Sequence, residues 1–151
     1  TGGRLKKVSH FLDQEETFCF TYGDGLADVD ISELIKFHQG HNKDATLTAV
    51  FPPGRFGALE IIDNSVVSFQ EKPRGDGALI NGGFFVLNQK VLSRIENAKT
   101  VWEQEPLNSL STDNQLMCFK HSGFWQPMDT IRDRVFLEEL WEQGKAPWKV
   151  W

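Results

Sequence analysis

The stretch TFCFTYGDG, residues 17–25, decides the class of fold, because an apolar run ends directly in a carboxylate between two glycines. Its aromatic and apolar residues predict a strand over 16–24 that ends at this turn. In an α/β sheet, side chains at the carboxyl end of a strand project into the crevice where ligands bind. Asp24 is therefore either a turn residue, freed by Gly23 and Gly25, or a ligand for a metal ion.

A helix is predicted directly after this strand, over residues 30–41. Asp30 is suited to cap its first turn, and Glu33 follows three residues later. Apolar residues recur on one face at the helical spacing and polar residues occupy the other. His38 and His41 fall at the end of this helix, where we expect helix-end or surface positions and not metal ligands.

Short strands and helical segments alternate along the rest of the chain. Strands are expected at 45–51, at 58–62 and 65–72 around an Asp63-Asn64 turn, at 78–88, at 115–121 and at 123–128, and helical segments at 88–97, 101–112 and 129–144. The glycine pair in the strand at 78–88 indicates a bulge or a close approach of another segment. Together these elements predict a mixed α/β domain.

The totals favour one folded domain that binds neither nucleic acid nor a membrane. The chain has 151 residues, 40% of them hydrophobic, and a formal net charge of −5. This length supports one core, and nucleic-acid phosphates need a basic protein face. No apolar run is long enough to span a membrane. Cys19 and Cys118 lie in apolar runs without zinc-site spacing, so we expect buried thiols and a cytoplasmic protein.

The stretch QEKPRGDG, residues 70–77, is a second candidate for chemistry. Glu71 and Lys72 are adjacent, so in a strand they point to opposite faces, and Pro73 ends the strand. A lysine held there can neutralise a phosphate, and a glutamate can accept hydrogen bonds from sugar hydroxyls. A solvated strand end accounts for the same residues, and the pattern alone leaves both interpretations open.

The stretch GFWQPMDT, residues 123–130, holds a second isolated carboxylate. Asp129 follows an apolar strand and opens the last helix, so helix capping explains it fully. The functional alternative pairs Asp129 with Asp24 around one Mg²⁺ ion. Magnesium binds through one or two carboxylates together with substrate phosphates, and two acidic strand ends suit that requirement.

The order of these motifs resembles the sugar-1-phosphate nucleotidylyltransferase family. The matching motifs are GDG (23–25), FPPGRFGAL (51–59), EKP (71–73), NGGFFV (81–86), WEQEP (102–106), WQPMDT (125–130) and the closing EQGKAPWKVW (142–151). The resemblance implies the nucleotide-diphospho-sugar transferase fold, a Rossmann-like mixed sheet. It is greatest to the members that transfer a cytidylyl group to glucose 1-phosphate.

The resemblance also implies roles at the matching positions. It assigns Asp24 and Asp129 to the Mg²⁺ ion and Lys72 to the phosphate of the sugar. The other substrate contacts that it implies are Arg4 near the nucleotide, Gly57 and Glu71 at the sugar, and Asn81 and Gly82 in the sugar pocket.

The implied substrates are CTP and glucose 1-phosphate. The implied reaction is an in-line attack of the sugar-phosphate oxygen on the α-phosphorus of CTP, without a covalent intermediate. We expect the intact enzyme to be a homo-oligomer.

One signature of the family is missing from the 151 residues. Its members carry a glycine-rich loop, GGxGTRL, after the first strand and a Pro-Lys pair after that, whereas TGGRL at 1–5 matches only poorly. We therefore expect the chain, residues 1–151, to be the C-terminal part of a single nucleotidyltransferase domain whose N-terminal part is missing. The fragment is then expected to be inactive alone.

Two other classes of function remain open. A non-catalytic sugar-phosphate-binding or assembly module would keep the sugar half of the site without the triphosphate loop. A nucleotide-sugar glycosyltransferase would share the sheet, although such enzymes usually carry a DxD motif where this chain has GDG.

Overall fold

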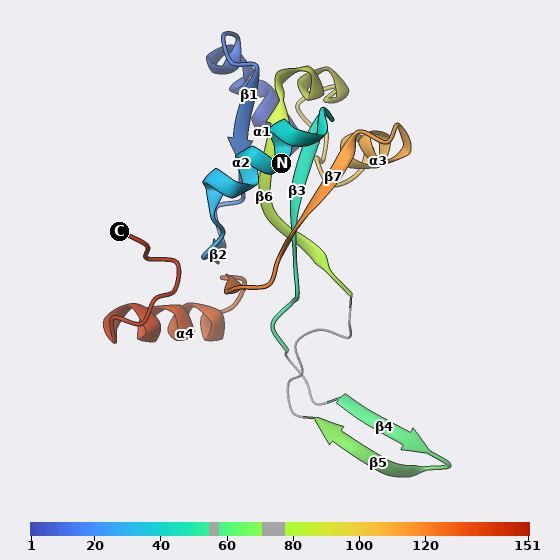
Figure 1. Cartoon of the computed structure of the whole chain (residues 1–151), viewed down its shortest axis with the longest axis vertical. Helices are drawn as coiled ribbons and strands as arrows, with labels where there is room; N and C mark the ends of the chain where they lie inside the picture. The colour runs from blue at the N-terminus through green and yellow to red at the C-terminus, as the bar shows by residue number, and fades with distance from the viewer. Residues whose placement is uncertain (55–57, 71–77) are drawn as a thin grey trace. The chain divides into compact units, whose positions relative to one another are not determined.

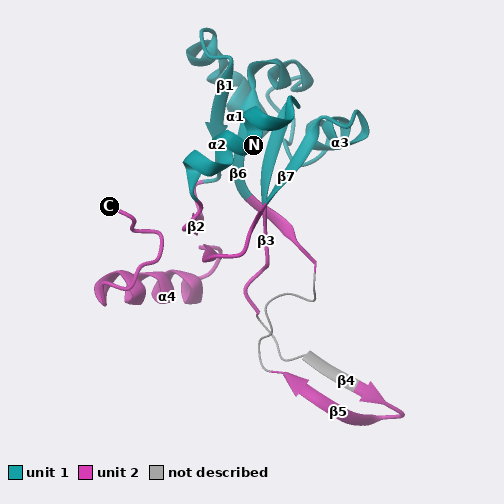
Figure 2. Cartoon of the chain, in the orientation of Figure 1, with its two compact units in different colours: residues 1–22, 30–48, 83–119 teal, residues 23–29, 49–82, 120–151 magenta. Residues whose placement is uncertain are grey.

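The computed structural model describes residues 1–54, 58–70 and 78–151. These residues form two compact units, drawn in teal and magenta in Figure 2. Unit 1 comprises residues 1–22, 30–48 and 83–119, and unit 2 comprises residues 23–29, 49–82 and 120–151. Three of the boundaries fall within strands, at 45–50, 80–88 and 116–121, so these strands are divided between the two units.

Figure 1 shows the elements of both units. In chain order they are α1 (Gly2–Lys7), η1 (Ser9–Leu12), β1 (Thr17–Phe20), β2 (Gly25–Ala27), α2 (Ile31–His41), β3 (Ala45–Val50), β4 (Ala58–Ile62), β5 (Ser65–Gln70), β6 (Ile80–Asn88), η2 (Gln89–Arg94), α3 (Glu105–Thr112), β7 (Leu116–His121), β8 (Trp125–Pro127) and α4 (Ile131–Glu142). The predicted α/β class is confirmed.

The principal sheet has four strands in the order β1-β6-β3-β7. Strand β1 runs antiparallel to β6, with Phe18 opposite Leu87. Strands that are neighbours in this sheet are distant in the sequence, as expected for an α/β sheet whose strands are separated by helices. Two further sheets have two strands each, β2 with β8 and β4 with β5.

Unit 1 contains the hydrophobic core. Its fully buried members come from α1, β1, β3, β6, η2 and α3 and from the segment before α3, and they are Leu5, Phe18, Ala45, Phe85, Leu87, Val91, Ile95, Trp102 and Leu110. Burial of each large apolar side chain contributes roughly 1.5–3 kcal/mol. The short helix α1, which the sequence did not predict, is held to this core by Leu5.

A closed network of hydrogen bonds joins α2 to β3 and β6 inside unit 1. The Lys43 N–H donates to Nδ1 of His41 (3.0 Å), so the neutral ring of His41 carries its proton on Nε2 and donates to Oγ1 of Thr46 (2.7 Å). The Thr46 hydroxyl then donates to Nδ1 of His38 (2.9 Å), whose Nε2 donates to Oδ1 of Asn88 (2.9 Å). Nδ2 of Asn88 donates to the Lys43 carbonyl (3.2 Å), which closes the network at the residue where it began.

Both histidines lie in the last turn of α2, as predicted, but His38 is buried and not at the surface. His38 is 3% exposed. A buried histidine needs partners for both ring nitrogens, and Thr46 and Asn88 supply them from two strands.

The glycine pair of β6 makes the close approach that the sequence predicts. Gly83 has a φ of +83°, and a Cβ atom there would lie 2.5 Å from Cδ2 of Tyr22. Only glycine tolerates this backbone conformation and this proximity at no cost.

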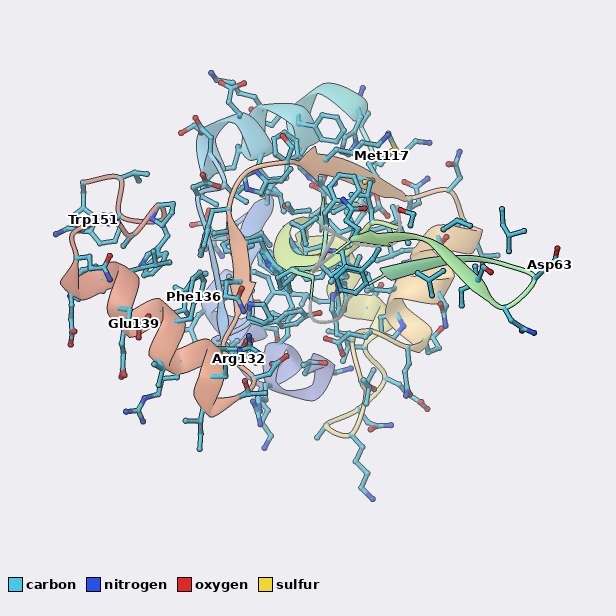
Figure 3. The ribbon with its side chains drawn as sticks, turned by 90° about the horizontal axis from the view of Figure 1, so that it is seen from below. Asp63, Met117, Arg132, Phe136, Glu139 and Trp151 are labelled. Atoms are coloured by element: carbon cyan, nitrogen blue, oxygen red, sulfur yellow. The ribbon has the colours of Figure 1, made fainter. Side chains whose placement is uncertain are left out.

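Strands β4 and β5 form the predicted hairpin, with Ile62 paired to Ser65. Asp63 and Asn64 between them have φ angles of 46° and 72°, which Asp and Asn tolerate and which match the twist of a two-residue hairpin turn. Figure 3 shows Asp63 at the tip of this hairpin.

The prediction of buried thiols is wrong. Cys19 and Cys118 are both free and exposed. Cys19 lies between Phe18 and Phe20, and since side chains alternate along a strand, the face that carries the two aromatic rings is not the face of Cys19.

The predicted helical segments are shorter than expected. The region 88–97 contains a 3₁₀ helix, η2, and the region 101–112 contains α3 only from Glu105. Within the residues that the structure describes, none of the helices has the length and apolar character to cross a membrane.

Candidate functional site

The candidate site lies in unit 2, where β2 and β8 pair antiparallel. Each strand has three residues, and Gly25 pairs with Pro127, Leu26 with Gln126 and Ala27 with Trp125. Pro127 occupies a position that needs no backbone N–H, as a proline in a strand requires. The ladder joins two segments that are about a hundred residues apart in the sequence.

Asp24 lies at one end of this ladder. The Met128 N–H donates to the Asp24 carbonyl at 2.7 Å, which adds one rung beyond the paired residues. Strand β1 ends at Phe20, so the expected strand over 16–24 is too long, and Asp24 precedes β2 instead of ending the first strand. The backbone of Asp24 is thus fixed one residue from Asp129.

Asp129 does not cap the last helix, so that interpretation is wrong. The N-cap of α4 is Thr130, whose Oγ1 accepts from the Asp133 N–H (3.2 Å) while the Asp133 carboxylate accepts from the Thr130 N–H (3.0 Å). This reciprocal capping box satisfies the start of the helix without the Asp129 carboxylate.

The glycines of the GDG motif leave space around the two carboxylates. Continuing the register of the ladder by two residues sets Asp129 opposite Gly23, and a Cβ atom at Gly23 would meet nothing within 4 Å. Asp24 and Asp129 are both exposed. The structure thus brings the backbones of Asp24 and Asp129 close together and leaves both side chains exposed, and a magnesium ion needs only one or two carboxylates beside its waters and substrate phosphates.

The donor set fits magnesium better than zinc. Among the described residues, no group of three or more His, Cys, Asp or Glu side chains is placed to hold a metal ion. Zinc sites use three or four such side chains, whereas magnesium needs one or two carboxylates beside its waters and substrate oxygens. Asp24 and Asp129 are the residues that would hold it.

Asn81 and Gly82, the expected sugar-pocket residues, lie in β6 beside β8. Nε1 of Trp125 donates to the Gly82 carbonyl at 2.8 Å, and Gly82 is buried. Gly25 adjoins the same contact, since a Cβ atom there would lie 3.7 Å from Nε1 of Trp125. One indole therefore joins the GDG motif to the NGG motif.

A cavity of about 240 Å³ lies in the same unit. It is lined by Phe51, Pro53, the segment His121–Gln126 and Phe136 of α4. Phe136 is labelled on α4 in Figure 3. Four of the lining residues are Phe or Trp, and apolar and aromatic side chains beside a few polar groups are typical of small-molecule sites.

The remaining predicted site residues are not brought to this ladder by the described structure. Lys72, Glu71 and Gly57 lie outside the described residues. Arg4 is exposed on α1 in unit 1. Their predicted roles stay predictions.

Asp28, His121 and Trp125 also belong to this region, although none of them was predicted as a site residue. Nε2 of His121 lies 2.8 Å from Oδ1 of Asp28, although 93 residues separate them. Trp125 belongs to the motif that drew attention to Asp129, and its position two residues before Pro127 was the available signal. Asp28 lies in the segment ADVD, residues 27–30, which looks like an ordinary loop before a helix.

The chain belongs to the nucleotidyl transferase family: residues 2–130 match the family described as Nucleotidyl transferase. This range contains both Asp24 and Asp129. The family match does not support the interpretation as a nucleotide-sugar glycosyltransferase.

The chain is similar over its whole length to enzymes that act on sugar phosphates. It is 64% identical over 151 residues to glucose-1-phosphate cytidylyltransferase of Salmonella typhimurium, covering 100% of this chain and 59% of that protein. It is 40% identical over 152 residues to probable glucose-1-phosphate cytidylyltransferase of Bacillus subtilis, with the same two coverages. The resemblance predicted from the motifs is confirmed. The chain spans about 59% of the length of these relatives, and its expected C-terminal position within them stays a prediction.

Solved structures of lower identity show the fold. HddC from Yersinia pseudotuberculosis matches with a TM-score of 0.69 at 21% identity over 93% of this chain and 62% of that chain. A putative glucose-1-phosphate thymidylyltransferase from Bacillus anthracis matches with a TM-score of 0.69 at 18% identity over 93% and 60%. The expected nucleotide-diphospho-sugar transferase fold is confirmed.

Proposed function

We propose that the intact protein transfers a cytidylyl group from CTP to α-D-glucose 1-phosphate, giving CDP-glucose and pyrophosphate. The observation that carries this proposal is the 64% identity over the whole chain to a glucose-1-phosphate cytidylyltransferase. The β2/β8 ladder supports it, because it brings Asp24 and Asp129 from two distant motifs to one end of one small sheet.

The residues of this chain bind and orient the substrates and hold no covalent intermediate. Lys72 holds the phosphate of glucose 1-phosphate, so that its oxygen faces the α-phosphorus of CTP in line with the departing pyrophosphate. Positioning of this kind converts a bimolecular reaction into an effectively unimolecular one. Glu71 accepts hydrogen bonds from sugar hydroxyls, while Gly57, Asn81 and Gly82 shape the sugar pocket.

Asp24 and Asp129 together hold Mg²⁺, and Arg4 contacts the nucleotide. A bound Mg²⁺ ion would supply positive charge that neutralises the charge developing on the phosphates. The two carboxylates supply only part of its coordination, so metal binding and nucleotide binding support each other.

We further propose that the intact protein is a cytoplasmic homo-oligomer. Apolar side chains exposed on α4 support self-association: Ile131 is 81% exposed and Trp141 50% exposed. Light scattering coupled to size-exclusion chromatography measures the oligomeric state, and a monomer at micromolar concentration contradicts this part of the proposal.

Kinetics of the intact protein test the function. With Mg²⁺, CTP and glucose 1-phosphate, we expect pyrophosphate release, which is lost in Asp24→Asn. Lys72→Ala removes a charged phosphate contact that is worth about 1.5–3 kcal/mol, so the KM for glucose 1-phosphate should rise roughly ten- to more than a hundredfold, and that for CTP much less.

Lys36→Ala is the matched control. Lys36 is an exposed lysine of α2 paired with Glu33 at 2.7 Å, so its loss should change neither KM. An unchanged response of Lys72→Ala to glucose 1-phosphate would make Lys72 a solvated strand end. Tight binding of glucose 1-phosphate without any pyrophosphate release would support the non-catalytic module instead.

A further inference from the structure

The ladder that joins Asp24 to Asp129 is too short to be stable through its own strands. Strands β2 and β8 have three residues each and form a sheet of only two strands. An isolated two-stranded sheet is marginal in water even when it is longer. Something beyond the paired residues has to hold its register.

The end of the ladder that lies away from Asp24 is closed by a side chain. The Asp28 N–H donates to the Phe124 carbonyl at 3.2 Å, as in an ordinary rung. The Phe124 N–H donates at 2.7 Å to Oδ1 of the Asp28 side chain. The Asp28 carboxylate thus replaces the backbone carbonyl that would normally accept this hydrogen bond at the end of the ladder.

His121 donates to the same oxygen. Its Nε2 lies 2.8 Å from Oδ1 of Asp28 and 3.2 Å from the Phe124 carbonyl. A carboxylate oxygen only accepts, so the proton of this contact is on Nε2 of His121. Hydrogen bonds to an ionised acceptor are about twice as strong as neutral ones, and here two converge on one atom.

Gly123 makes this convergence possible. A Cβ atom at Gly123 would lie 2.4 Å from Oδ1 of Asp28 and 2.7 Å from Cε1 of His121. Any other residue there would displace the carboxylate or the imidazole. The loop between β7 and β8 is therefore built around the contact between Asp28 and His121.

We propose that Asp28 and His121 are positioning residues that clamp the β2/β8 ladder and so hold Asp24 and Asp129 in register to bind the metal ion. This inference rests on the proposed function, which assigns those two aspartates to the ion. Neither Asp28 nor His121 touches a substrate in this account. Both act through the backbone: Asp24 and Asp28 flank β2 at its two ends, and Phe124 and Met128 flank β8.

The register of the ladder matters because it determines which residues lie beside each other at its end, and a shift by one residue would move Asp24 relative to Asp129. Loss of the contact between Asp28 and His121 frees one end of a three-residue ladder, which then depends on the Met128–Asp24 hydrogen bond and on the side-chain contacts of Trp125 and Gln126. Variants that lose the contact between Asp28 and His121 should therefore bind the metal ion more weakly while the protein still folds.

Binding of Mn²⁺ to the intact protein in the presence of CTP, followed by electron paramagnetic resonance, tests this proposal. Asp28→Ala and His121→Phe should each weaken Mn²⁺ binding about tenfold, the lower end of the range for residues that support metal ligands. Asp28→Asn and His121→Gln keep an acceptor and a donor respectively, so they should recover most of the affinity. Hydrogen exchange of the Met128 amide should accelerate in the two disruptive variants.

Asp30→Ala controls for a general loss of stability. Asp30 accepts from the Glu33 N–H at 3.0 Å as the cap of α2, so its removal lowers the melting temperature without touching the ladder, and Mn²⁺ affinity should not change. If Asp28→Ala does not fold, His121→Phe decides the question.

The outcomes separate this inference from the proposed function. Wild-type Mn²⁺ affinity in His121→Phe and Asp28→Ala, with binding lost in Asp24→Asn, would overturn the clamp and leave the metal site intact. Wild-type affinity in Asp24→Asn would overturn the metal site, and the positioning role with it.

Discussion

The first turn of α4 is capped by Thr130 and not by its neighbour Asp129. Thr130 closes the start of α4 through the capping box with Asp133, which leaves the helix no need for the carboxylate of its neighbour. Asp133 also accepts from Nε2 of Gln126 at 2.9 Å, so the same box holds β8.

Thr46 and Thr48 are a matched pair for testing the buried network. Both are fully buried on β3, but among the described residues Thr48 Oγ1 has no hydrogen-bond partner, whereas Thr46 Oγ1 contacts His38 and His41. Thr46→Val should destabilise the protein by about 1–3 kcal/mol, because two ring nitrogens lose their partner. Thr48→Val should be neutral or stabilising by up to about 1 kcal/mol.

Urea unfolding followed by circular dichroism measures both variants of this pair. Equal losses of stability would show that the hydroxyl of Thr46 contributes nothing beyond its volume.

The same network predicts a loss of stability in acid. Burial and the neighbouring His38 hold the pKa of His41 below its usual value. Since the unfolded chain binds the proton more readily, with a pKa near 6.5, the free energy of unfolding should fall as the pH drops from about 7 to about 5. The other charged groups at this end of α2 are Lys43 and the ion pair of Asp44 with Lys90 (2.5 Å).

Unfolding titrations at pH 7.5 and 5.5 measure this dependence. His41→Gln keeps a donor for Thr46 and does not titrate, so the difference in stability between the two pH values should shrink. A difference of the same size in both proteins would assign the acid sensitivity to other groups.

At the scale of elements, substitution by alanine should lower the stability of the protein at Gly83 and raise it at Gly40. Gly83 combines a φ of +83° with the ring of Tyr22 at 2.5 Å from the added atom. Gly40 lies near the end of α2, and a Cβ atom there would meet nothing within 4 Å. Gly83→Ala should cost at least about 1–3 kcal/mol, whereas Gly40→Ala should stabilise by about 0.5–1 kcal/mol.

Thermal denaturation compares the two glycine variants directly. Tyr22→Leu in the Gly83→Ala background should recover the steric part of the loss and leave the backbone part. A stable Gly83→Ala single variant would contradict the close approach.

The sequence correctly predicted the elements whose own residues show a periodic, capping or turn pattern. Strand β3, helix α2 with its cap at Asp30, and the Asp63-Asn64 hairpin were all predicted correctly. Strand β2 was not predicted, because three residues are too few to show an alternating pattern. It is a strand only because it pairs with β8, which is distant in the sequence. The helical segment at 88–97 was expected from composition, whereas the structure forms only a 3₁₀ turn there.

The same reason limits what could be predicted of the site. Asp24 and Asp129 stand out as carboxylates at the ends of apolar runs. Asp28 and His121 do not, since each has an ordinary local context and their contact depends on the register between distant segments. The burial of His38 depends in the same way on Thr46 and Asn88, which lie on other elements.

At the scale of the whole molecule, the 151-residue chain alone should have no cytidylyltransferase activity. The GGxGTRL loop, which the resemblance assigns to the triphosphate, is not among these residues. Pyrophosphate release with CTP, Mg²⁺ and glucose 1-phosphate should stay at background. Addition of the intact protein as a positive control verifies the assay, and turnover by the isolated chain near that of the intact protein would show that the loop is dispensable.

The β4–β5 hairpin has a consequence for the behaviour of the chain in solution. Val66, Val67 and Phe69 of β5 are 55%, 52% and 62% exposed, and each strand of a two-stranded sheet offers one edge without a neighbour. An apolar, uncharged edge of this kind is a template for intermolecular strand addition and amyloid-like stacking. At high concentration, aggregation of the isolated chain should begin at SVVSF, and Val67→Lys should delay the rise of thioflavin T fluorescence by placing a charge where the next strand would add.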